Sequence, residues 1–235
     1  MTQPGARRAA ALSPAPGRPA IIAHSAGNTA SRAQAAIAEC ADFLEVDLWV
    51  HRGRFEARHE RRLPARVPLL LERWYVTLPP RVRFGLAELL AESAGEAGVF
   101  LDLKNGGAVA AQLIRRSLQG RDGGARLVAS SQSWSLLREV QAICPGVDVY
   151  YSVDVPAQLD LLFSVMTHDR APAGASCRHS LLSEKVVEDL HAAGLSIVAW
   201  TVDDPKRAQT LARWGVDALT TQRAADLRAA LATGG

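Results

Sequence analysis

The chain has 235 residues, a net charge of +3 and 48% hydrophobic residues. This length suits one large α/β domain, and this composition is sufficient for a full hydrophobic core. The arginines are dispersed along the chain, which argues against nucleic-acid binding. No apolar run is long enough to span a bilayer, so we expect no stable membrane insertion.

The first 19 residues are rich in Ala, Pro, Gly and Arg and lack the apolar stretch of a signal peptide. We interpret residues 1–19 as a disordered leader and residues 20–235 as a single domain. The three cysteines, Cys40, Cys144 and Cys177, are widely spaced and odd in number. This cysteine usage favours a reduced compartment, and we expect a cytoplasmic protein.

Short apolar runs alternate with amphipathic helical stretches from residue 20 to the end of the chain. A hairpin with its turn around Gly53 and its return at residues 55–59 interrupts the alternation, and residues 60–83, rich in Pro and Arg, follow it. Strands are predicted at residues 20–24, 43–48, 99–104, 126–130, 148–152, 174–177, 196–201 and 217–220. Helices are predicted at residues 29–40, 85–93, 108–118, 134–142, 157–165, 183–193, from Pro205 onward, and 224–231.

Eight strands, each followed by a helix, predict a (β/α)8 barrel, the TIM-barrel architecture. An open doubly wound sheet is the alternative, because counting strands does not establish closure. No glycine-rich dinucleotide fingerprint follows any of the strands.

The catalytic groups of such barrels lie at the C-terminal ends of the strands. Ionisable residues occupy several of these ends, and residues two apart on one strand point to the same side. The candidates are His24 after the first strand, Glu45 and Asp47 on the second, His59 after the hairpin, and Asp102 and Lys104 on the third.

Carboxylates within apolar runs need a partner, because burying an unpaired charge is costly. The three acids would suit a hard divalent cation, Mg²⁺ or Ca²⁺, and His24 and His59 would suit acid and base catalysis. Lys104 would offset phosphate charge. Each residue alone has an ordinary explanation, such as an ion pair or packing. Their convergence on one end of one barrel predicts metal-assisted phosphoryl transfer. Trp200, which ends the seventh strand, is assigned to the substrate pocket, with packing at the rim as the alternative.

Six motifs follow one another in the chain: I-I-A-H at 21–24, A-D-F-L-E-V-D at 41–47, H-R-G-R-F-E-A-R-H at 51–59, L-D-L-K at 101–104, V-A-W-T-V-D-D at 198–204 and W-G-V-D-A-L-T-T at 214–221. Their order resembles the glycerophosphodiester phosphodiesterase family. The most specific part is E-V-D followed by a hairpin that ends in His and by an acid-x-Lys strand.

The resemblance implies a role for each matched residue. His24 and His59 match the catalytic histidines of the family, and the three acids match its ligands for Ca²⁺ or Mg²⁺. Lys104 matches its phosphate-contacting lysine. The family hydrolyses a glycerophosphodiester to glycerol 3-phosphate and an alcohol, and a neighbouring hydroxyl of the substrate attacks phosphorus first. The implied partner is a small phosphodiester or lysophospholipid.

The sequence also departs from the family pattern. Ser25 stands where an arginine normally follows the first histidine, the following loop is shortened around Asn28, and Asp102 replaces the usual Glu. The insertion that many members carry after the third strand is missing. These departures leave two alternatives open: a lyase similar to sphingomyelinase D that gives a cyclic phosphate, and a catalytically weak barrel that binds a phosphodiester.

Overall fold

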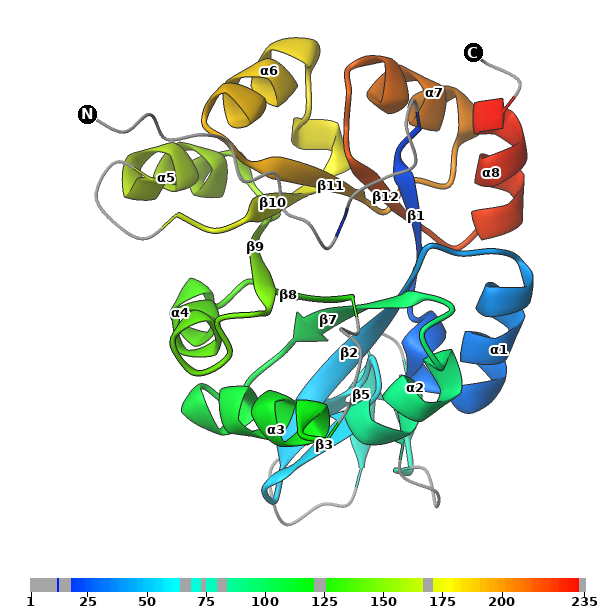
Figure 1. The fold of residues 1–235 in the computed structure, drawn as a ribbon, viewed down its shortest axis with the longest axis vertical. Helices are drawn as coiled ribbons and strands as arrows, with labels where there is room; N and C mark the ends of the chain where they lie inside the picture. The colour runs from blue at the N-terminus through cyan, green and yellow to red at the C-terminus, as the bar shows by residue number, and fades with distance from the viewer. Residues whose placement is uncertain are drawn as a thin grey trace.

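Eight parallel strands close into a barrel at the centre of the molecule (Figure 1). This computed structural model describes residues 12, 18–63, 69–72, 75–79, 84–120, 126–166 and 171–232. The first strand pairs with both the second and the last, which closes the sheet, so the predicted (β/α)8 barrel is confirmed. The strands are β1 (Ala20–Ala23), β2 (Phe43–His51), β7 (Gly98–Leu103), β8 (Leu127–Ser131), β9 (Asp148–Val153), β10 (Gly174–Arg178), β11 (Ser196–Trp200) and β12 (Ala218–Thr221).

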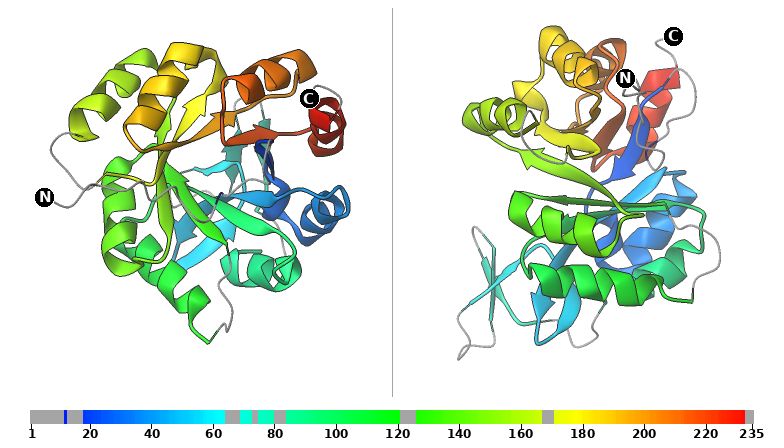
Figure 2. Two further views of the ribbon diagram at one scale, coloured as in Figure 1. Left: turned by 45° about the horizontal axis from the view of Figure 1, so that its top comes forward. Right: turned by 60° about the vertical axis from the view of Figure 1, so that its left-hand side comes forward.

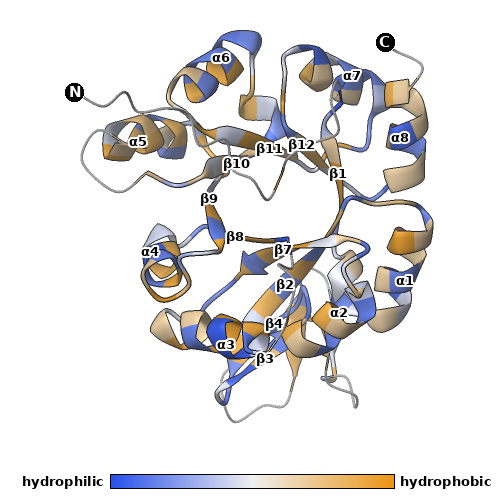
Figure 3. Ribbon diagram, in the orientation of Figure 1, coloured by the Kyte–Doolittle hydropathy of each residue, from blue (hydrophilic) through white to orange (hydrophobic). Residues whose placement is uncertain are grey.

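The helices form an outer ring around the strands (Figure 2). Their polar faces are turned to solvent, whereas the strands are mostly hydrophobic (Figure 3). Side-chain caps set several N-termini: Thr29, Ser183 and Asp204 each accept a hydrogen bond from a backbone N–H of the first turn. The helices are α1 (Ala30–Ala38), α2 (Leu86–Ser93), α3 (Ala108–Leu118), α4 (Trp134–Ile143), α5 (Pro156–Met166), α6 (Glu184–Ala192), α7 (Pro205–Arg213) and α8 (Ala224–Ala232), with short 3-10 turns at Ala26–Asn28 and His179–Leu181.

The inside of the barrel changes character along its axis. Near the N-terminal ends of the strands it is apolar, with Ile22, Phe43 and Phe100 in one buried cluster. Alternate residues of a strand share a face, so the inward-facing positions after Phe43 on β2 and Phe100 on β7 also point into the barrel. Toward the C-terminal ends of these strands, acids occupy them. Leu12 is also buried in this cluster. Of the proposed leader, residues 1–11 and 13–17 lie outside the described residues.

A hairpin and a small second sheet extend from β2. The hairpin strand β3 (Arg54–Ala57) pairs antiparallel with β2. Beyond it, β4 (Arg61–Arg62), β5 (Leu70–Glu72) and β6 (Tyr75–Thr77) form a three-stranded antiparallel sheet that projects beyond the ring of helices (Figure 2). We call this sheet the arm. The sequence patterns predict no element here, because its strands are only two or three residues long.

Two general expectations can be compared with the described residues. None of the helices among them is both long enough and apolar enough to cross a membrane. Cys40, Cys144 and Cys177 carry free thiols. The cytoplasmic location stays a prediction.

Candidate active site

The predicted site residues converge at the C-terminal ends of the barrel strands, which we call the barrel mouth. A cavity of about 900 Å³ opens there. Its lining includes all seven predicted site residues: His24, Glu45, Asp47, His59, Asp102, Lys104 and Trp200. Half of the other lining residues carry small hydroxyl side chains, among them Ser130, Ser152, Ser176 and Thr220.

Strand register brings the three acids together. Asp47 of β2 lies directly opposite Asp102 of β7 in the parallel ladder, and Glu45 lies two residues earlier on the same face. One carboxylate oxygen from each acid can be chosen so that all lie within 4.8 Å of one another. Lys104 joins the cluster through ion pairs to Asp102 and, at 2.7 Å, to Asp47 Oδ1.

The protonation of this cluster depends on burial and on Lys104. Burial raises the pKa of Glu45 well above its ordinary value, and the negative charges of Asp47 and Asp102 add to the effect. Burial also raises the pKa of Asp102, against the opposing charge of Lys104. Burial would do the same to Asp47, but Lys104 and Asn28 outweigh it and hold the pKa of Asp47 below its ordinary value. Burial opposes a raised pKa at Lys104, yet its two acid partners keep that pKa above the ordinary value.

This cluster fits a divalent cation. Three carboxylates share a small volume and a single ammonium group offsets one of their charges, so two protons or one divalent cation is needed for balance. Carboxylate oxygens are the ligands that Mg²⁺ and Ca²⁺ prefer. Glu45, Asp47 and Asp102 are therefore the residues that can hold the metal expected from the sequence.

The loop after β1 holds the acids in place, and the sequence patterns did not assign it to the site. The backbone N–H of Ser25 donates to the Glu45 carboxylate, and the Ser25 hydroxyl donates to Asp47 Oδ2 at 3.1 Å. Asn28 makes a reciprocal pair with Asp47: its amide donates to Oδ2 at 2.8 Å and its carbonyl accepts from the Asp47 N–H at 2.9 Å. The available signal was an asparagine in the short loop that follows the first barrel strand.

Gly27 lets this loop approach the barrel closely. A Cβ at this position would lie 2.7 Å from side-chain atoms of Val46 and Leu89. Only glycine therefore fits between β2 and α2 here. The shortened loop is packed onto the site rather than open.

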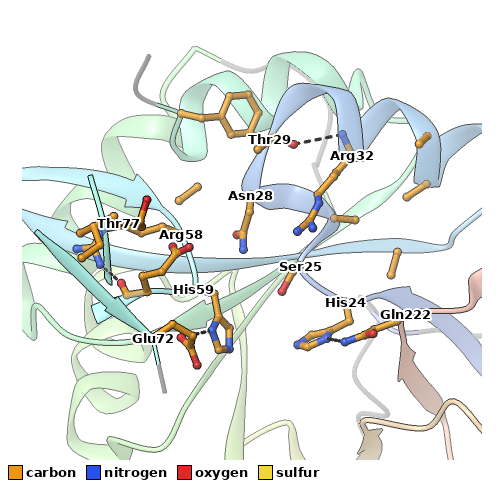
Figure 4. Close-up of a pocket in the computed structure, with 18 of the residues that line it drawn as sticks. His24, Ser25, Asn28, Thr29, Arg32, Arg58, His59, Glu72, Thr77 and Gln222 are labelled. Atoms are coloured by element: carbon orange, nitrogen blue, oxygen red, sulfur yellow. Dashed lines mark hydrogen bonds and ion pairs between the residues drawn. The ribbon is translucent and has the colours of Figure 1, made fainter. Parts of the chain in front are cut away.

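The two histidines face each other across the opening (Figure 4). Burial lowers the pKa of His24 from its ordinary value, with Asp47 opposing the shift. The His24 Nδ1 lies 3.5 Å from the side-chain amide of Gln222. His59, which follows β3, is hydrogen-bonded to Glu72 of the arm, with 2.7 Å between Nδ1 and Oε2.

A second cavity, of about 1060 Å³, adjoins the first. Its lining runs from Ser25 and Arg32 to Tyr75 and Leu78 on and beside the arm. Both histidines and Glu72 line the two cavities in common. The histidines therefore stand where the two spaces meet.

The arginines near Ser25 differ in how they are engaged. Arg58 is buried; it pairs with Glu56 at 3.2 Å, donates to the Glu60 carbonyl and lies over the Trp49 ring. Arg32 is exposed on α1, and its side chain extends toward Ser25 (Figure 4). Among the described residues, Arg32 has no carboxylate partner for its guanidinium.

The acids after β11 have supporting roles. Asp203 accepts hydrogen bonds from the Thr221 hydroxyl and the Gln222 N–H, both at 2.8 Å, and so fixes the end of β12. Asp204 caps α7. Trp200 lines the first cavity, and its indole N–H donates to the Ser176 carbonyl at 2.9 Å.

A closed (β/α)8 barrel with three acids, a lysine and two histidines at its mouth suits an enzyme of metal-assisted phosphoryl transfer. Comparison with family profiles agrees. The glycerophosphoryl diester phosphodiesterase family matches residues 103–225, just over half of the chain. The chain belongs to this family of phosphodiester-hydrolysing enzymes.

Solved structures show the same fold over nearly the whole chain. A Silicibacter pomeroyi protein assigned as a glycerophosphoryl diester phosphodiesterase is 19% identical, with 97% of this chain and 98% of that chain covered and a TM-score of 0.79. An Oleispira antarctica phosphodiesterase in complex with the product sn-glycerol-3-phosphate is 20% identical, with 92% and 98% covered and a TM-score of 0.74. A Parabacteroides distasonis glycerophosphodiester phosphodiesterase is 19% identical over 92% and 98%, with a TM-score of 0.72. A comparison with curated protein sequences finds no match.

Proposed function

We propose that the protein hydrolyses small glycerophosphodiesters to glycerol 3-phosphate and an alcohol, with a divalent metal and with acid–base catalysis by His24 and His59. The position of the two histidines carries the proposal: they stand between two cavities and beside the three acids. A phosphodiester has two substituents, and two adjoining cavities offer one space for each. The related Oleispira protein binds sn-glycerol-3-phosphate as a product, which supports glycerol phosphate as one half of the substrate.

The environments of the two histidines favour different roles. Because burial lowers its pKa, His24 is neutral at neutral pH and can accept a proton from the attacking hydroxyl at a ring nitrogen. His59 then donates a proton to the leaving alcohol oxygen as its bond to phosphorus breaks. The attacking oxygen is then bonded to phosphorus in a cyclic phosphate. In the second step His59 accepts a proton from a water that attacks phosphorus, and His24 returns its proton to the ring oxygen as its bond to phosphorus breaks, which gives glycerol 3-phosphate.

A metal bound by Glu45, Asp47 and Asp102 would neutralise charge on the phosphoryl oxygens. Lys104 complements it. Its ammonium group has three donors, and two of them are directed to Asp47 and Asp102. The third can donate to a phosphate oxygen next to the metal ligands.

Arg32 is the residue that we assign to the anion in place of an arginine after His24. The Arg58 guanidinium is already satisfied by Glu56 and the Glu60 carbonyl. Arg32 lines the second cavity and extends toward Ser25. It therefore offers planar N–H donors to a phosphate held between the histidines.

The test is release of glycerol 3-phosphate from a panel of glycerophosphodiesters and lysophospholipids, with Mg²⁺, Ca²⁺ or EDTA present. We expect metal-dependent release, and we expect His24→Ala and His59→Ala each to abolish it while the circular dichroism spectrum is unchanged. Near wild-type turnover by either variant would remove that histidine from the mechanism.

The panel also separates the alternatives that Ser25 leaves open. Phosphorus NMR distinguishes glycerol 3-phosphate from a cyclic phosphate, and a cyclic final product identifies the lyase. A folded protein that binds the metal but turns over no member of the panel would instead be a binding barrel.

A further inference from the structure

The arm brings a carboxylate to one of the two histidines. Glu72 Oε2 lies 2.7 Å from His59 Nδ1, and the His59 ring extends from this contact toward the space shared with His24 (Figure 4). The Glu72 side chain is 20% exposed, whereas that of His59 is 52% exposed. A half-exposed ring has little packing to fix its rotamer, so this contact is its principal restraint.

The sequence of β5 directs Glu72 inward. Leu70 and Glu72 are two residues apart and share one face of the strand, whereas Leu71 lies on the other. Leu70 is buried at 1% exposed and Leu71 is 39% exposed, so the Leu70 face is the inner one. Tyr75 lies opposite Glu72 in β6 and, like Leu70 and Glu72, lines the second cavity.

Contacts that do not involve His59 attach the arm to the rest of the molecule. Arg62 of β4 pairs with Glu56 of β3 at 3.2 Å, and Leu70 is buried. Tyr75 donates to Glu60 at 3.1 Å. The contact between Glu72 and His59 is therefore not needed to hold the sheet, and its effect falls on the histidine.

We infer that Glu72 is a positioning residue for His59. Its carboxylate accepts the hydrogen bond from Nδ1–H, which stabilises the protonated ring and turns its Nε2–H toward the reacting phosphodiester. Once Nε2 has given up its proton, the same contact holds the neutral ring in the Nδ1–H tautomer. The inference rests on the proposed function, in which His59 protonates the leaving alcohol. The arm then contributes to catalysis, because residues 70–72 hold the general acid His59 from outside the barrel.

The experiment compares Glu72→Gln and Glu72→Ala with the wild type on two substrates, glycerophosphocholine and the p-nitrophenyl diester of glycerol phosphate. On glycerophosphocholine we expect kcat to fall about 10- to 100-fold, more for Ala than for Gln, with KM changed less than about twofold. Because p-nitrophenolate leaves without a proton, the loss on the nitrophenyl diester should be several-fold smaller. Glu139→Gln is the matched control, since it removes one negative charge from an exposed position on α4 that lines neither cavity.

Equal losses on both substrates would overturn the inference, because a general disturbance of the site does not depend on the leaving group. Unchanged kcat in both Glu72 variants would also overturn it. His59→Ala separates this failure from failure of the proposed function. If His59→Ala is inactive on glycerophosphocholine while Glu72→Ala is fully active, only the role of Glu72 is wrong; if His59→Ala is active, the mechanism itself fails.

Discussion

At the scale of single residues, the barrel mouth is a set of charges in which most groups already have partners. Lys104 binds two acids, Arg58 binds Glu56, and His59 binds Glu72. Ser25 uses its N–H and hydroxyl to hold Glu45 and Asp47. A serine at this position therefore supports the carboxylates, and the positive charge that it lacks must come from elsewhere.

Arg32 is the predicted source of that charge. Arg32→Gln should lower kcat/KM about tenfold, the lower end of the range for a hydrogen bond to a charged group, because the side chain is exposed. Steady-state kinetics on glycerophosphocholine measures the change. Arg115→Gln removes the same charge from an exposed position on α3 and should leave kcat/KM unaltered. If both variants lose activity equally, the effect is one of net charge and the assignment of Arg32 is wrong.

The burial of His24 predicts how kcat/KM falls on the acid side of its pH profile. The base must be neutral, and burial lowers its pKa below the ordinary 6.5. Activity should therefore persist as the pH falls through 6.5 and decline only when the lowered pKa is reached. A profile of kcat/KM against pH, with metal in excess at each point, gives the midpoint of this limb. A midpoint above 6.5 would contradict the role of His24 as the base.

At the scale of elements, the arm and the barrel differ in how far the sequence predicts them. The helix Ala108–Leu118 has the predicted bounds, and every other bound predicted for a barrel element lies within about three residues of the observed one. Their apolar periodicity is long enough to be read from one chain. The arm strands are two or three residues long, and their register depends on pairing across residues distant in sequence. No local pattern specifies such a sheet.

The candidate site likewise has residues that the sequence predicts and residues that it does not. The three acids occupy inward-facing positions of β2 and β7, and the alternation of side chains along a strand predicts that they share one face. Glu72 and Asn28 were not predicted, because their partners are contributed by other segments of the chain. The family match covers residues 103–225, so both histidines and all three acids lie outside it. Their roles depend on geometry and remain predictions.

The two faces of β5 provide a test of the arm as an element. Leu70→Ala should lower kcat about tenfold, because loss of the buried side chain loosens the strand that carries Glu72. The melting temperature of the barrel should change little, since Leu70 lies outside both core clusters of the barrel. Leu71→Ala, on the exposed face, should change neither quantity. A large fall in melting temperature with Leu70→Ala would show that the arm is part of the barrel's cooperative unit.

At the scale of the whole molecule, function and stability oppose each other at the barrel mouth. The apolar cluster near the N-terminal ends of the strands stabilises the fold, whereas the acids at the other end destabilise it when they are ionised and unpaired. A bound cation removes this repulsion. Metal binding should therefore appear in the stability of the whole protein as well as in catalysis.

Glu45 determines whether the stability of the metal-free protein rises or falls with pH. Its pKa in the folded protein is raised above the ordinary 4.5, so the unfolded chain releases this proton more readily, and rising pH favours unfolding until the folded pKa is passed. Asp102 acts in the same direction. Asp47 acts in the opposite direction, but its lowered pKa affects stability only near and below its ordinary 3.8. With EDTA present, the melting temperature should therefore fall as pH rises from about 5 to 8.

Mg²⁺ or Ca²⁺ should reverse this fall. At a concentration 100-fold above Kd, the cation should raise the melting temperature by about 5–10 °C at pH 8 and by less at pH 5, where Glu45 keeps its proton. Glu45→Gln is the matched variant, because it retains the shape of the side chain and cannot ionise. It should lose most of the pH slope and most of the metal-induced rise. If differential scanning calorimetry shows the same slope and the same rise in Glu45→Gln, the acid cluster is not the metal site and the pH dependence has another origin in the chain.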